Sequence, residues 1–343
     1  MTWPPAGASG PQTDPGSAGE APPAGYHATA DLLALVATAA DAIGSRAVLE
    51  LLGTTVEGRP IPVLRVAAPG RTPDRRRPQA MVLGGIHGCE VIATELALDL
   101  ALAVCAEAPD DAVAAVLDVA DVVVVPTLNI DGRVASLRSL ADRGIWNPAP
   151  RRNAHGVDLN RNFPVPPGAV PSRNPLSGTS RRALPWYRGP APLSEPESRA
   201  LATLAEQVRP FVLLNLHSTG TILTYPWGSR PEPPADEVGF LAMIEAFTAA
   251  QPHVTYGSKQ SRAWYPILGA SNDWFHDRFA TLALTVEVSP PAAEVKRDTR
   301  LGRWFFWFAN PIDRDRWVAN DLPGCWAALA AAHAYRQPID IGP

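Results

Sequence analysis

The chain has 343 residues, of which 46% are hydrophobic and 19% charged, values typical of a soluble globular protein. Its formal net charge of −4 gives no basic surface for nucleic acid or an anionic membrane, and no apolar run is long enough to span a bilayer. Three scattered cysteines cannot build a disulfide framework, so we expect a reducing, cytoplasmic compartment.

The first 26 residues are rich in Pro, Gly and Ala and predict a disordered tail. This segment lacks the basic and apolar regions of a signal peptide. No linker or internal repeat divides the rest of the sequence, so we expect residues 27–343 to fold as one domain.

The N-terminal half of this domain alternates between predicted helices and strands. Residues 29–44 have the apolar spacing of an amphipathic helix, and residues 47–56 and 61–68 predict an antiparallel strand pair at a sheet edge. A buried strand over residues 81–86 leads into a helix over residues 91–106. A second buried strand begins at Asp121 and is followed by turn residues.

The middle of the chain is less regular. Residues 133–186 are rich in Arg, Asn and Pro and predict a long irregular region, which in a compact domain is usually functional. Ser194 and Glu197 have the spacing of a capping box, which predicts the start of a helix over residues 195–208.

The C-terminal half continues the alternation. A third buried strand begins at Phe211 and ends at His217, and residues 281–289 predict a fourth. Between these strands we expect a helix over residues 239–250 and a short amphipathic helix over residues 271–279, capped by Ser271. An aromatic segment over residues 303–311 and a helix over residues 325–336 follow.

Buried strands that alternate with helices predict the α/β class, here a single domain with a mixed, mainly parallel central sheet and helices on both faces. Ligands of such sheets bind outside the carboxyl ends of the strands. We therefore expect the polar residues that follow the strands to converge on one crevice.

His87 and Glu90 lie between a buried strand and the helix that follows it. His217 ends another buried strand and is the natural third member of this set. Two imidazoles and a carboxylate suit a catalytic zinc, which needs three protein ligands and an open position for water. By itself, the His-x-x-Glu spacing favours a core histidine beside a glutamate at a helix start, and only the rest of the sequence reverses that preference.

Glu287 is a carboxylate in an otherwise apolar strand, where it is costly unless it is paired or functional. We interpret it as a general base for water, with a core ion pair to an arginine as the alternative. The stretch RRNAHGVDLNRNFP, residues 151–164, offers guanidinium groups that suit a carboxylate or an oxyanion. Taken alone, that stretch would be read as a solvated loop.

Together these motifs resemble the zinc metallocarboxypeptidases of the carboxypeptidase A type. That family shows His-x-x-Glu, an Arg-x-Asn and Asp-x-Asn-Arg-Asn loop, a strand ending in His-Ser, Ser-x-Asp-Trp and a late strand with Glu. In this sequence the motifs follow the same order and cover about residues 53–289; they read HGCE, RRN, DLNRN, HS, SNDW and TVEV.

The resemblance implies one Zn²⁺ per chain, held by His87, Glu90 and His217. It also implies that Asp158 orients His87 from behind. Glu287 is then the base and later the proton shuttle.

The resemblance assigns substrate contacts as well. Arg151, rather than its neighbour Arg152, is expected to polarise the scissile carbonyl and stabilise the oxyanion. Asn160 and Arg161 are expected to hold the C-terminal carboxylate of the substrate, and Tyr265 to close over it.

Two positions depart from the pattern of many relatives. Cys89 replaces an Arg or Asn, and its thiol is either a small filler of the turn or a redox-sensitive group beside the metal. Asn272 occupies a position that in relatives helps to set specificity at the pocket floor. Because Asn is neither apolar nor acidic, it indicates a polar terminal residue.

The function that the resemblance implies is hydrolysis of the C-terminal amide bond of a peptide with a free carboxylate. The loop at residues 151–164 also resembles that of bacterial murein peptide amidases, which cut the γ-D-glutamyl–diaminopimelate bond, so a cell-wall peptide is an alternative substrate. A non-catalytic peptide-binding module on the same fold is the alternative of another class, disfavoured because no catalytic position is lost.

Overall fold

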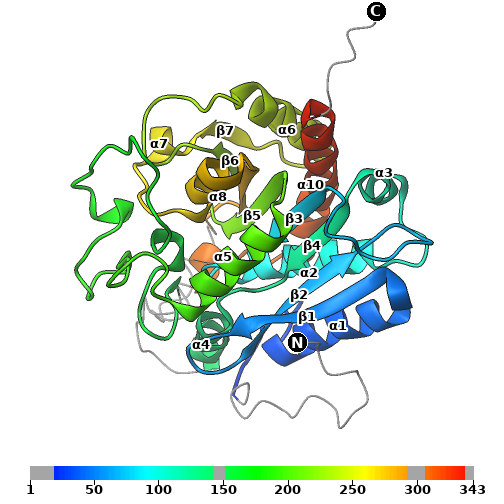
Figure 1. Ribbon diagram of the computed structural model, residues 1–343. Coiled ribbons are helices and arrows are strands. Elements are labelled where there is room, and N and C mark those ends of the chain that lie inside the picture. The colour runs from blue at the N-terminus through cyan, green and yellow to red at the C-terminus, as the bar shows by residue number, and fades with distance from the viewer. Residues whose placement is uncertain (1–18, 142–150, 292–305, 337–343) are drawn as a thin grey trace, which may run out of the picture.

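The computed structural model describes residues 19–141, 151–291 and 306–336. Its centre is an eight-stranded sheet with the order β1-β2-β4-β3-β5-β8-β6-β7 (Figure 1). The strands are β1 Ala47–Thr54, β2 Pro60–Val66, β3 Gln79–Leu83, β4 Asp121–Val125, β5 Val212–Ser218, β6 Ile222–Tyr225, β7 Gly257–Gln260 and β8 Leu282–Val288.

The sheet is mixed and mainly parallel. Strands β4, β3, β5 and β8 run parallel to one another, and β6 runs parallel to β7. The β1–β2 pair is antiparallel and lies at one edge, as predicted. Because β3, β5 and β8 are neighbours that run the same way, the residues at their carboxyl ends meet at one edge of the sheet.

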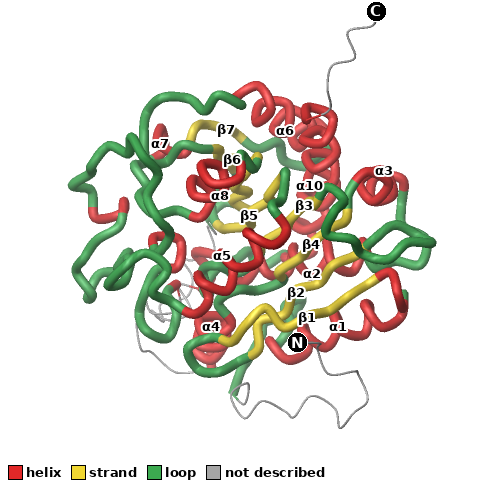
Figure 2. Tube along the Cα trace, viewed as in Figure 1, coloured by secondary structure: helices red, strands yellow, loops and turns green. Residues whose placement is uncertain are grey.

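Helices cover both faces of this sheet, which confirms the predicted α/β class (Figures 1 and 2). Alternate residues of each strand face opposite sides, so Val82 and Val124 belong to one buried core and Met81 and Val123 to the other. The first core includes α1, α2, α3, α6 and α10, and the second includes α5 and α8. The bounds are α1 Thr29–Ala42, α2 Val91–Val104, α3 Asp111–Val119, α4 Ile130–Ala141, α5 Pro196–Val208, α6 Glu237–Ala249, α7 Ser261–Trp264, α8 Ser271–Phe279 and α10 Arg314–Arg336.

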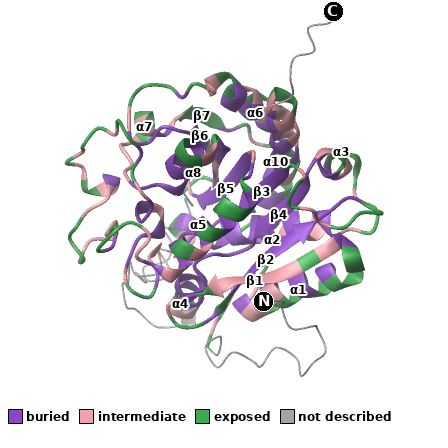
Figure 3. Cartoon of the chain, in the orientation of Figure 1, coloured by how far each residue is buried: buried purple, intermediate pink, exposed green. Residues whose placement is uncertain are grey.

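The central strands are buried on both faces, and Figure 3 shows β3, β4 and β5 enclosed by the helices. All three cysteines are free and buried. Within the described ranges, no helix is both long and apolar enough to cross a membrane.

The irregular region predicted over residues 133–186 is wrong in its first part, where α4 continues to Ala141. Ile130, Val134, Leu137 and Leu140 have helical spacing and are all buried, so the apolar period that identifies the helix was present in the sequence. Residues 142–150 lie outside the described part. From residue 151 to α5 the chain has no strand or α-helix; it contains the 3₁₀ turns Leu159–Arg161 and Pro175–Ser177 and an isolated β-bridge between Thr179 and Tyr187.

The capping box predicted at the start of α5 is also wrong. The helix begins at Pro196, which has no N–H to satisfy, and the Ser194 hydroxyl donates to Glu195 instead. Glu197 accepts hydrogen bonds from the backbone N–H of Val56 and the side chain of Asn153, so its carboxylate ties α5 to two loops.

Two predicted boundaries also differ. The terminal helix begins at Arg314 rather than at residue 325. The tail predicted over residues 1–26 is described only from residue 19, and there Tyr26 is buried and its phenol donates to the carbonyl of Pro311 at 2.6 Å. This end of the segment therefore packs on the domain.

Candidate active site

The turn between β3 and α2 carries two of the predicted metal ligands. β3 ends at Leu83, earlier than predicted, and Gly84 and Gly85 then lead to His87 and Glu90. A Cβ atom on Gly84 would lie 2.4 Å from the carbonyl oxygen of Pro126, and Gly85 has a φ of +62°. Only glycine fits this close approach and this backbone conformation.

A residue far along the chain closes this turn. The Asn310 side chain accepts a hydrogen bond from the backbone N–H of Ile92 at 2.8 Å and donates to the carbonyl of Cys89 at 2.9 Å. It thereby satisfies a free donor at the start of α2, whose N-cap is Glu90. Local sequence patterns do not predict this contact, because it joins residues more than 200 positions apart.

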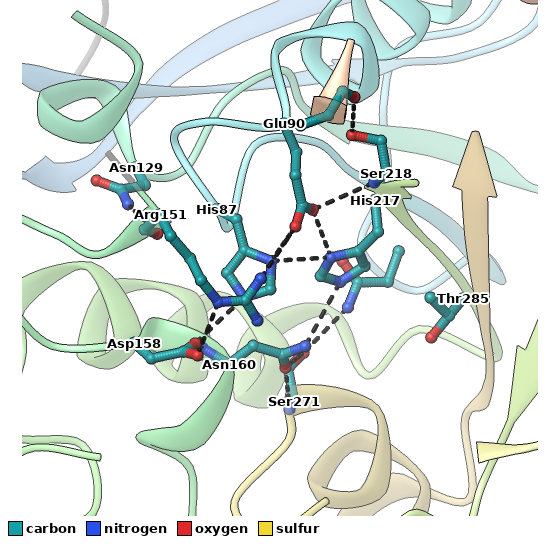
Figure 4. A network of polar contacts seen from close by, with 12 residues as sticks. His87, Glu90, Asn129, Arg151, Asp158, Asn160, His217, Ser218, Ser271 and Thr285 are labelled. Atoms are coloured by element: carbon teal, nitrogen blue, oxygen red, sulfur yellow. Dashed lines mark hydrogen bonds and ion pairs between the residues drawn. The ribbon is translucent and has the colours of Figure 1, made fainter. Parts of the chain in front are cut away.

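His87, Glu90 and His217 converge on one point, as Figure 4 shows. The two Nδ1 atoms lie 3.1 Å apart, and each is within 2.9 Å of a different oxygen of Glu90. All three residues are at most 4% exposed. These donors are of the type that zinc takes, and two nitrogens about 2.0–2.1 Å from a tetrahedral ion would be separated by a little over 3 Å. The three residues therefore fit a zinc ion.

The electrostatics of this cluster favour an ionised Glu90. Burial acts to raise the pKa of Glu90, but the charges and hydrogen bonds of His87 and His217 outweigh it and hold that pKa below its ordinary value. The carboxylate of Glu90 also accepts hydrogen bonds from the backbone N–H of Ser218 and from Arg151 Nη1, each at 3.2 Å.

Asp158 supports the cluster from behind. One carboxylate oxygen lies 3.1 Å from His87 Nε2, and the other accepts a hydrogen bond from Arg151 Nε at 3.1 Å. A carboxylate on the far nitrogen of a histidine fixes the ring orientation and tautomer. Arg151 thus lies between Asp158 and Glu90 (Figure 4). Arg152 points elsewhere, because its guanidinium donates to the carbonyls of Arg182 and Leu184.

Glu287 is placed next to the cluster by strand register. On β8 it pairs directly with His217 of β5. Burial, and next the negative charge of Glu90, raise the pKa of Glu287 well above its ordinary value, while Arg151 and Arg161 oppose the shift. A buried carboxyl group with a raised pKa beside a metal-ligand cluster is typical of a general acid or base.

A cavity of about 380 Å³ joins these residues to the remaining predicted site residues. Every residue that the sequence predicted for metal binding, catalysis or substrate contact lines it: His87, Glu90, Arg151, Asn160, Arg161, His217, Tyr265, Asn272 and Glu287.

Asn160 and Arg161 approach the cavity with their orientation fixed. Asn160 accepts hydrogen bonds from the backbone N–H and the hydroxyl of Ser271, so its amide nitrogen faces His217 Nε2 at 3.5 Å. Ser271, the predicted cap of α8, therefore does not cap the helix. The N-cap is Ala270, and Ser271 binds Asn160 instead. Arg161 donates to the carbonyl of Leu176 from Nε and Nη2 and to that of Asn160 from Nη1.

These bonds use three of the five guanidinium N–H groups of Arg161 and leave one on each terminal nitrogen. Two free N–H donors on one guanidinium can serve the two oxygens of a carboxylate.

Cys89 lines the same cavity and is 4% exposed. Burial, and next the charge of Glu90, raise the pKa of its thiol, although Arg151 acts in the opposite direction. A buried thiol with a raised pKa is unreactive. These observations favour the small filler of the turn over the redox-sensitive group.

Comparison with known proteins agrees with this geometry. The model of the zinc carboxypeptidase family matches residues 32–313. The chain is 30% identical to carboxypeptidase B of Homo sapiens over 263 residues, which cover 74% of this chain and 60% of that protein. It is 26% identical to carboxypeptidase D of Rattus norvegicus over 321 residues, which cover 80% of this chain but only 22% of the longer relative.

Solved structures share the fold. Carboxypeptidase A from Helicoverpa armigera superposes with a TM-score of 0.70 at 21% identity, over 91% of this chain and 75% of that chain. Bovine thrombin-activatable fibrinolysis inhibitor, solved in complex with tick carboxypeptidase inhibitor, gives a TM-score of 0.69 at 21% identity, over 90% and 97% of the two chains. With the family match spanning most of the sequence, the chain belongs to the zinc carboxypeptidase family.

Proposed function

We propose that the protein is a zinc-dependent metallocarboxypeptidase that hydrolyses the C-terminal amide bond of peptides. The observation that carries the proposal is the convergence of His87, Glu90 and His217 at one side of a cavity that Glu287 and the free N–H groups of Arg161 also line. Membership of a family whose relatives are carboxypeptidases supports the same reaction.

Zinc, when bound, supplies Lewis-acid polarisation and positive charge that lowers the pKa of nearby water and carboxyl groups. Glu287 takes the proton from the attacking water and passes it to the leaving amine. Arg151, held by Asp158 and Glu90, keeps free N–H groups that donate to the developing oxyanion. Because its partners fix the guanidinium before the substrate binds, little reorganisation is needed.

The restriction to the chain end comes from a second set of residues. Arg161 and Asn160 bind the terminal carboxylate, and their own hydrogen bonds to Leu176 and Ser271 hold them in place. Tyr265 follows the short helix α7 and closes the cavity over the bound residue.

The test compares His217→Ala with His253→Ala, which removes an exposed histidine outside the cavity. We expect the first variant to lose zinc and peptide hydrolysis, and the second to keep one zinc per chain and full activity. A His217→Ala protein that retains its zinc would contradict the proposed metal site. Zinc binding without hydrolysis of any free-acid peptide would instead indicate a binding module. A murein tripeptide in the substrate panel tests the cell-wall alternative.

A further inference from the structure

The strands that carry His217 and Glu287 also form the floor of the cavity. In the β5–β8 register, His217 pairs with Glu287, and two residues earlier Asn215 pairs with Thr285. Residues two apart on a strand share a face and lie about 6.6 Å apart. Thr285 lines the cavity, and in the view of Figure 4 it lies on the opposite side of the ligand cluster from Asp158.

Asn272 lines the same floor, but its amide group is already committed. Its Nδ2 donates to the carbonyl of Ala283 at 3.2 Å and to the Thr285 hydroxyl at 2.7 Å. Its Oδ1 accepts from Asn215 at 2.7 Å. With both of its N–H groups used, Asn272 orients Thr285 rather than contacting a ligand itself.

The Thr285 hydroxyl accepts a hydrogen bond from Asn272, so its own proton remains free to donate into the cavity. Its cross-strand partner on β6 is Thr224, which also lines the cavity. The Thr224 hydroxyl lies 3.0 Å from that of Ser261, and Ser261 also donates to the carbonyl of Tyr225 at 3.0 Å. When Ser261 donates to that carbonyl, Thr224 donates to Ser261 and presents its oxygen as an acceptor.

The floor therefore offers a hydroxyl donor and a hydroxyl acceptor side by side, on residues whose Cβ atoms are about 4.5–5.5 Å apart. A carboxamide carries an acceptor oxygen and donor N–H groups on one planar carbon, and the two groups point in different directions, so one carboxamide can bind the hydroxyl donor and the hydroxyl acceptor at once.

Among the residues that the structure describes, none offers an uncommitted counter-charge to a charged substrate side chain at this floor. Asp273 lines the cavity, but its carboxylate accepts hydrogen bonds from the backbone N–H groups of Gly228 and Ser229. Arg161 faces the substrate carboxylate in the proposed function, and Arg151 is held by Asp158 and Glu90. Burial of an unpaired charge is costly, and an apolar side chain would leave the Thr285 hydroxyl without a partner.

We propose that the terminal residue of the substrate carries a neutral carboxamide, as in Gln or Asn, and that Thr285 and Thr224 recognise it. This inference rests on the proposed carboxypeptidase function. It assigns Asn272 the role of positioning Thr285.

The test uses N-blocked dipeptides that end in Gln, Met, Glu or Lys, which have similar lengths but differ in polarity and charge. With the zinc-loaded enzyme, we expect kcat/KM for the Gln peptide to exceed that of each of the others by at least about tenfold. Thr285→Val should bring the Gln-to-Met ratio close to one. Thr281→Val is the matched control, because it makes the same change at the residue just before β8, where the hydroxyl donates to the carbonyl of Pro210 outside the cavity.

A second readout separates this inference from the proposed function. Calorimetric titration of the zinc-loaded Glu287→Gln variant with the same peptides ranks the terminal residues without turnover, and the Gln peptide should bind most tightly. If no peptide is hydrolysed, the proposed function fails, and the binding order alone decides the inference. Three outcomes would overturn the carboxamide pocket. The first is a Met, Glu or Lys peptide that binds most tightly, and the second is no binding of the Gln peptide. The third is an equal Gln-to-Met ratio for Thr285→Val and Thr281→Val.

Discussion

Replacing Arg161 with methionine is expected to remove the preference for a free C-terminal carboxylate. Arg161 keeps two N–H groups free after its bonds to the carbonyls of Leu176 and Asn160. Hydrogen bonds to charged groups contribute about 1.5–3 kcal/mol each, so two of them amount to about 3–6 kcal/mol. The corresponding loss in kcat/KM for a free-acid peptide is roughly 10²–10⁴-fold.

The substitution also leaves the half-buried carbonyl of Leu176 without its donor, which lowers stability and affects every substrate. The assay therefore measures kcat/KM for pairs of peptides that differ only in a C-terminal acid or amide. The acid-to-amide ratio cancels the structural effect and isolates carboxylate recognition.

Arg152→Met is the matched control, because that guanidinium donates to Arg182 and Leu184 away from the cavity. We expect it to keep the wild-type ratio. If Arg161→Met lowers activity on acid and amide equally, another group binds the carboxylate and the reasoning about the free N–H pair is refuted.

Three further predictions concern catalysis, the turn and pH. Glu287→Gln should abolish turnover while the zinc content, measured by metal analysis, stays at one per chain, because shape is kept and the base is lost. Asn310→Ala should lower the free energy of unfolding by about 2–4 kcal/mol and weaken zinc binding, since it leaves two buried backbone groups at the turn unpaired; unchanged urea unfolding would contradict this. Burial raises the pKa of Asp321 to about 6, against hydrogen bonds from Tyr256, Asn320 and Gln251 that lower it. A folded-state pKa above the unfolded value means that ionisation disfavours folding, so stability relative to Asp321→Asn should fall by about 2 kcal/mol between pH 4 and pH 7. A constant difference between the two proteins would show that Asp321 does not titrate in this range.

The parts of the site that the sequence predicted are those that local chemistry determines. His87 and Glu90 lie in one short turn, and His217 and Glu287 each belong to a buried strand, so residue type and strand pattern sufficed to single them out. The parallel order of β3, β5 and β8 then brings them together. Their individual roles remain predictions.

The contacts that the sequence missed are tertiary. Asn310 reaches the start of α2 from a segment that follows the whole sheet, and its amide looks like any other in the sequence. Ser271 has the residue type of a helix cap, but the nearby Asn160 side chain takes both its N–H and its hydroxyl. Local capping preference is weak enough for one such neighbour to override it. By contrast, α4 was missed although its apolar spacing was readable.

The position of Asn310 affects the order in which the protein matures. A ribosome releases the N-terminal part of a chain first, so His87 and Glu90 emerge long before His217, and Asn310 emerges last of all. Until Asn310 closes the turn, the N–H of Ile92 and the carbonyl of Cys89 lack these partners, and Glu90 is held less firmly. Tight metal uptake should therefore come late in biosynthesis, and nascent chains stalled before residue 310 should hold zinc poorly. Under the proposed function, hydrolysis would begin only after residue 310 has joined the fold.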